Sequence, residues 1–166
     1  MKVLIAYYSM KGTTKRVAEA LAGRLRCDIE EIRSVRSRKG LWGFVVSGFE
    51  VAFKQLGTIH PTKLDPAAYD LIIIGTPVWG NNMSSLTRTY LTQYRMKFKR
   101  VAFFCTCSSS GIESTFRNMG DLCGKEPVAS LGLTADDFKK GSDMQISPRH
   151  IREIEVFVKQ LGERKE

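Results

Sequence analysis

The chain has 166 residues and a mass of 18.7 kDa, which suits one domain with one core, so we expect a single domain over residues 1–166. Hydrophobic residues make up 43% of the chain and charged residues 26%, which excludes the disordered and fibrous classes. The formal net charge of +9 favours anionic partners without identifying them.

The sequence shows no sign of membrane insertion or export. The longest apolar stretch, residues 41–53, is interrupted by Ser47 and Glu50 and is shorter than the roughly 20 residues of a bilayer-spanning helix. Residues 1–8 lack the basic segment and cleavage site of a secretion signal. We therefore expect a cytoplasmic protein without a membrane span, whose four cysteines are reduced thiols.

Five short apolar runs alternate with amphipathic segments, a pattern typical of strands and helices around a parallel sheet. The β-branched run Ile72-Ile73-Ile74 indicates a central strand that is buried on both faces. Ser147 followed by Pro148 predicts the start of a final helix. The expected strands are residues 2–8, 28–32, 71–75, 100–106 and 128–133, and the expected helices are residues 13–26, 41–56, 84–94, 112–123 and 147–161. The predicted fold class is α/β, with a doubly wound five-stranded parallel sheet.

Such sheets bind ligands beyond the carboxyl ends of their strands, so the segments after the first, third and fourth strands are the candidate site. After the first strand, Ser9, Thr13 and Thr14 surround Gly12 at the start of a helix. Hydroxyls, a flexible glycine and free helix N–H groups favour an anion, which we interpret as a phosphate. A simple capping turn is the alternative.

The segments after the third and fourth strands complete the candidate site. Trp79 stands beside Asn81 and Asn82 at the edge of the sheet, where an indole favours a flat ligand over a merely structural role. Residues 105–111 are small and polar, so their backbone can approach a planar ring.

Together these residues resemble the flavodoxin-like FMN-binding flavoproteins of the short-chain flavodoxin type. The resemblance is carried by Tyr8-Ser9, by Gly12-Thr13-Thr14, by the run from Gly75 to Trp79 and by the small loop after Phe104, and it covers essentially the whole chain. It implies the strand order 2-1-3-4-5 and FMN as cofactor, with the phosphate at residues 9–14 and the isoalloxazine ring between residues 76–82 and 106–111.

The resemblance assigns the binding residues and leaves the chemistry to the flavin, with no catalytic residue and no metal. Hydroxyls of the first loop contact the phosphate, Trp79 packs near the ring, and backbone amides around Val78, Gly80, Cys107 and Ser108 bond the ring edge. The predicted cofactor-binding residues are Ser9, Met10, Lys11, Gly12, Thr13, Thr14, Thr76, Pro77, Val78, Trp79, Gly80, Asn81, Thr106, Cys107, Ser108 and Gly111.

The chain departs from many flavodoxins in two ways. Its third loop has no aromatic residue before Phe116, so one face of the ring is expected to be open, and the chain is basic where electron carriers are usually acidic. We predict electron carriage between redox partners, with an NAD(P)H-dependent reductase of quinones or similar acceptors as the alternative. The partner is then a redox protein or a small acceptor, with NAD(P)H as a further ligand in the second case.

Other features have simpler interpretations. Cys105 and Cys107 face the same side of a strand, but with only two histidines in the chain a zinc site is not expected. The apolar stripe in residues 41–56 is interpreted as core, with a lid over the flavin or a homodimer contact as alternatives. The basic clusters are interpreted as solvated surface, and nucleic acid is not an expected partner because no aromatic-rich basic surface accompanies them.

Overall fold

In the computed structural model the elements alternate as the sequence predicts, and residues 1–35, 56–134 and 146–163 are described. The strands are β1 (Val3–Tyr7), β2 (Asp28–Glu31), β3 (Leu71–Trp79), β4 (Asn82–Met83), β5 (Val101–Cys107) and β6 (Ser130–Thr134). The helices are α1 (Thr13–Leu25), α3 (Ser85–Tyr94), α4 (Ile112–Cys123) and α5 (Pro148–Glu163), with short 3-10 helices η1 (Pro66–Ala68) and η2 (Arg95–Lys97). The predicted helix at residues 41–56 lies outside the described residues except for Leu56.

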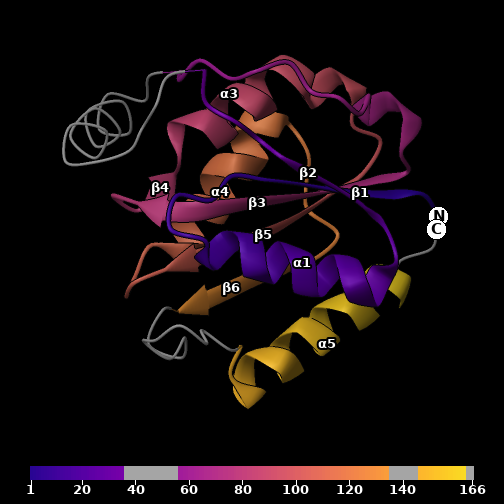
Figure 1. Ribbon diagram of the computed structural model, residues 1–166, viewed down its shortest axis with the longest axis vertical. Helices are drawn as coiled ribbons and strands as arrows, with labels where there is room; N and C mark the ends of the chain where they lie inside the picture. The colour runs from indigo at the N-terminus through magenta and orange to yellow at the C-terminus, as the bar shows by residue number, and fades with distance from the viewer. Residues whose placement is uncertain (36–55, 135–145, 164–166) are drawn as a thin grey trace.

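Five parallel strands form the sheet in the order β2-β1-β3-β5-β6, which confirms the predicted order 2-1-3-4-5. Helices α1 and α5 cover one face of the sheet, and α3 and α4 cover the other (Figure 1). The crossovers that contain α1, α3 and α4 place a helix against the sheet, and the three strands β1, β3 and β5 are buried over most of their length. Among helices in the described ranges, none is long and apolar enough to cross a bilayer.

The structure extends two of the predicted elements. Strand β3 continues past Gly75 to Trp79 because it turns back and pairs with β4, a short antiparallel strand that the sequence analysis did not predict. Helix α5 begins at Pro148, as predicted, and the backbone N–H of His150 donates to Ser147 Oγ at 3.2 Å. This bond is the predicted cap.

One glycine sets the packing in the middle of the sheet. Gly75 lies level with Phe104 on the neighbouring strand β5, and a Cβ atom at position 75 would lie 2.0 Å from Phe104 Cζ. The Phe104 ring therefore occupies the space above the Gly75 backbone, where both residues are buried. A side chain at position 75 is excluded because the core is close-packed and the ring has nowhere to move.

We expect Gly75→Ala to lower the free energy of unfolding by about 1–3 kcal/mol, the usual cost of an overpacked core. Urea denaturation measures the change. Shortening the ring in the double variant with Phe104→Leu makes room for the new methyl group, so the two effects should be less than additive. Strict additivity would show that the contact does not limit packing.

Candidate functional site

The loop after β1 forms an anion cradle at the start of α1. Gly12 precedes the helix with a φ of 89°, and no side chain caps the helix there. The first helical bond runs from the Arg16 N–H to the Gly12 carbonyl, so the amides before Arg16 have no partner within the helix. Ser9 Oγ accepts a hydrogen bond from the Gly12 N–H at 3.1 Å, which folds the loop over. A Cβ atom on Gly12 would meet nothing within 4 Å, so open space lies beside these donors.

A buried hydrogen bond joins this cradle to the end of β5. Thr14 and Thr106 are 1% and 5% exposed, and their hydroxyl oxygens lie 2.8 Å apart. The two residues are separated by 92 positions in the sequence, so the contact is purely tertiary. It connects the first predicted loop with the third.

The second predicted loop is a tight β-hairpin rather than an open loop. Trp79 of β3 pairs with Asn82 of β4, and the two residues between them, Gly80 and Asn81, have φ values of 53° and 58°. Two consecutive residues with positive φ are typical of a type I′ turn, which suits the twist of a hairpin. The amide oxygen of Asn82 accepts the N–H of Met83 at 2.9 Å and holds the returning strand.

The start of α4 holds the hairpin turn in place. A Cβ atom at Gly111 would lie 2.7 Å from Cα of Asn81 and 3.0 Å from a methyl group of Val78, so only glycine allows this approach. The single hydroxyl proton of Ser114 is shared between the Asn81 carbonyl at 2.8 Å and the Gly111 carbonyl at 3.1 Å. The second and third predicted segments are therefore in direct contact.

An aromatic contact joins the first segment to the hairpin. The rings of Tyr8 and Trp79 meet edge to face, with centroids 5.8 Å apart and an interplanar angle of 87°. Trp79 is only partly buried. All three predicted segments thus meet at the carboxyl edge of the sheet, each tied to another by a named contact.

The third segment supplies a polar and exposed wall. Ser108, Ser109 and Ser110 are exposed, and the next aromatic residue, Phe116, stacks on Phe103 with centroids 6.5 Å apart. Phe103 is a fully buried residue of β5, and Phe116, which is itself partly buried, packs against that core. Residues 105–115 contain no aromatic residue, so the exposed part of this segment is formed by small and polar side chains.

The cysteines have no arrangement typical of metal or disulfide chemistry. None of the four forms a disulfide, and Cys105 and Cys107 are buried in β5. Burial raises the pKa of the Cys105 thiol far above its ordinary value, and Cys107 adds to the effect, so Cys105 is protonated and unreactive at neutral pH. Among the described residues, no three His, Cys, Asp or Glu side chains are grouped to hold a metal ion.

The structure also shows residues that the sequence analysis did not assign to the site. Tyr8 and Ser114 hold the rim together, and β4 completes the hairpin. The Gly80-Asn81 pair was the available signal, because such pairs favour hairpin turns. Thr76 is fully buried, and its hydroxyl donates to the Pro77 carbonyl and accepts the Ser84 N–H, both at 3.0 Å. Its role toward a ligand stays a prediction, as do those of the other predicted residues.

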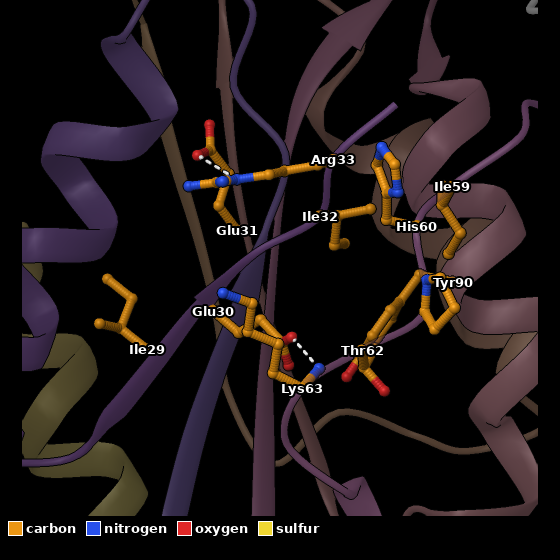
Figure 2. Close-up of a pocket in the computed structure, with 11 residues that line it drawn as sticks. Ile29, Glu30, Glu31, Ile32, Arg33, Ile59, His60, Thr62, Lys63 and Tyr90 are labelled. Carbon is orange, nitrogen blue, oxygen red and sulfur yellow. Dashed lines mark hydrogen bonds and ion pairs between the residues drawn. The ribbon is translucent and has the colours of Figure 1, made fainter. Parts of the chain in front are cut away.

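A separate cavity of about 500 Å³ lies along the outer edge of β2 (Figure 2). Glu30 binds the backbone N–H groups of Lys63 and Leu64 there, so both of its carboxylate oxygens are engaged. Glu31 pairs with Arg33 at 3.3 Å. None of the predicted cofactor-binding residues lines this cavity, which is bounded by Ile29, Glu30, Glu31, Ile32, Arg33, Ile59, His60, Pro61, Thr62, Lys63 and Tyr90.

Comparison with solved structures supports the fold. The chain matches a Lactobacillus acidophilus flavoprotein solved in complex with FMN, with a TM-score of 0.70 and 23% identity over 79% of this chain and 92% of that one. It matches a Bacteroides uniformis protein with a TM-score of 0.74 and 22% identity over 95% and 97% of the two chains. It also matches oxidised flavodoxin 1 from Bacillus cereus with a TM-score of 0.59 and 17% identity over the full length of both.

The sequence itself matches a family model. The model, described as flavodoxin, aligns with residues 46–132, which is more than half of the chain. This stretch contains strand β3, the hairpin, β5 and the start of α4, which are the elements that form two of the three rim segments. Together with the strand order, the match shows that the chain belongs to the flavodoxin family.

Proposed function

We propose that this protein binds FMN at the carboxyl edge of its sheet and carries electrons between redox partners. The observation that carries the proposal is the meeting of three segments at one rim, through Thr14 and Thr106, Asn81 and Ser114, and Tyr8 and Trp79. Membership of the flavodoxin family and the FMN bound to the Lactobacillus acidophilus flavoprotein support FMN as the ligand.

The cradle at Gly12 fits a phosphate. It combines free amides at a helix start with a glycine whose Cβ side is open, and a phosphate there is stabilised by the helix dipole and by several N–H donors. Ser9 and Thr13 are both partly buried, so each is in contact with the protein and still accessible to a ligand. Lys11 is exposed beside them and adds positive charge.

The rim beside the contact between the hairpin and the third segment is where we place the flat ring. Trp79 offers a partly exposed indole on one side, and the exposed serine wall offers backbone N–H groups near Cys107 and Ser108 on the other. When bound, FMN supplies the electron-accepting and electron-donating centre, and the protein holds the ring and sets its potential. The contacts of Gly111 and Ser114 with Asn81 join this segment to the hairpin turn and restrain both.

The purified protein, freed of flavin, should bind FMN with a Kd of about 1 μM or below, measured by quenching of flavin fluorescence. Gly111→Ala should weaken FMN binding by about tenfold, because the added methyl group displaces the hairpin turn at Asn81 and costs ring-edge hydrogen bonds. Failure of the wild-type protein to bind FMN would exclude the proposed cofactor.

Gly124→Ala is the matched control for this experiment. Gly124 also has a positive φ, 65°, but a Cβ atom there would meet nothing within 4 Å. Both variants carry backbone strain, so their unfolding free energies should fall, and only Gly111→Ala should lose FMN affinity. Equal affinities in the two variants would show that the contact with Asn81 does not support the ring site.

A second function is favoured by the open wall of the site. Residues 105–115 contain no aromatic residue and residues 108–110 are exposed, so none of these side chains provides an aromatic cover for a bound ring. A nicotinamide could therefore reach the ring from this side. This geometry favours an NAD(P)H-dependent reductase of quinones or similar small acceptors as the second candidate.

Rapid mixing of the FMN-loaded protein with NADH or NADPH separates the two candidates. For a carrier, we expect the visible flavin absorption to persist for minutes with either nucleotide and to disappear at once with dithionite. Loss of that absorption within seconds of adding either nucleotide would instead establish the reductase, with the preferred nucleotide given by the faster rate. Free FMN mixed with each nucleotide is the control for direct reaction.

A further inference from the structure

The bond between Thr14 and Thr106 has an unused proton. Each threonine hydroxyl has one proton, and the single bond between the two oxygens uses one of them. Within the described part of the chain, neither hydroxyl donates to another acceptor. Since both side chains are at most 5% exposed, the second proton is withheld from bulk water and favours a bound acceptor.

The fold indicates which hydroxyl points toward that acceptor. Thr14 is the second residue of α1, in the turn whose free amides form the cradle beside Gly12. Thr106 is the penultimate residue of β5, outside the cradle loop, and its hydroxyl oxygen lies 2.8 Å from that of Thr14. Both hydroxyl protons are used if Thr106 donates to Thr14 Oγ1 and Thr14 donates its own proton into the cradle.

We propose that Thr106 is a positioning residue for the FMN phosphate: its hydroxyl donates to Thr14 Oγ1 and thereby directs the Thr14 proton toward a phosphate oxygen. The inference rests on the proposed function and deepens it. Sequence resemblance assigned Thr106 to the ring loop, whereas the geometry assigns its side chain to the phosphate end. The strand β5 then serves both ends of the cofactor, the phosphate through Thr106 and the ring through the segment that follows.

Comparing FMN with riboflavin tests the inference, because riboflavin has the same ring but no phosphate. We expect Thr106→Val to weaken FMN binding by about fivefold to tenfold, which lies within the range for one hydrogen bond between neutral groups, and to change riboflavin affinity by less than about twofold. Thr106→Ser retains the hydroxyl and should restore FMN affinity. Dissociation constants come from flavin fluorescence titrations of the flavin-free protein.

The double variant Thr14→Val with Thr106→Val should bind FMN no more weakly than Thr14→Val alone, because Thr106 acts only through Thr14. Thr115→Val is the matched control. Thr115 is a fully buried threonine of α4 whose hydroxyl has no hydrogen-bond partner among the described residues, so the same substitution there should leave the affinities for both flavins unchanged. Thermal unfolding of each variant shows whether the fold is retained.

The outcomes separate the two proposals. Equal losses of FMN and riboflavin affinity in Thr106→Val would overturn the positioning role and return Thr106 to the ring. Unchanged FMN affinity in that variant would overturn it as well, while FMN binding by the wild-type protein would still stand. A wild-type protein that binds neither flavin would overturn the proposed function, and the role of Thr106 with it.

Discussion

The site depends on the register of the parallel sheet. Glu31, Tyr7, Gly75, Phe104 and Leu131 lie level across the five strands. This row is the last in which all five strands are paired side by side. Beyond it only β3, β5 and β6 continue, and the segments that follow the row form the rim. A shift of one strand by a single residue would exchange its two faces and separate the segments of the rim.

The rim combines three kinds of contact, each suited to its place. The buried hydroxyls of Thr14 and Thr106 join the start of α1 to β5. The close approach of Gly111 and the hydrogen bond of Ser114 fix the hairpin. The edge-to-face contact of Tyr8 and Trp79 joins the residue after β1 to the end of β3. Loops that must hold a ligand are normally the mobile part of a fold, and here rigid elements restrain them. A restrained rim reduces the ordering that binding would require.

Much of this organisation could be predicted from the sequence because it follows from periodicity. The run Ile72-Ile73-Ile74 identified the central strand, and Ser147-Pro148 identified the start of the last helix. The continuation of β3 to Trp79 was not predicted, because its partner β4 is only two residues long and so has no periodic pattern. The Gly80-Asn81 pair between Trp79 and Asn82 is compatible with an open loop as well as with a hairpin.

Side-chain partners within the site were beyond prediction for a related reason. The hydroxyl of Thr14 meets that of Thr106 across 92 positions, and a single sequence contains no signal for such a pair. Phe116 was recognised as the next aromatic residue after the third loop, but its stacking on Phe103 depends on how α4 packs against β5. The sequence locates the segments, and packing decides which of their groups face a ligand.

The position of α5 has a consequence for biosynthesis. Ile154, Phe157 and Leu161 of this helix are at most 1% exposed and lie in the same core as α1 and its face of the sheet. While the ribosome is still translating the segment before α5, all five parallel strands have already been made, yet part of that face has no cover. The nascent chain therefore presents an apolar surface during this interval, which is the kind of surface that chaperones recognise and that aggregates when crowded.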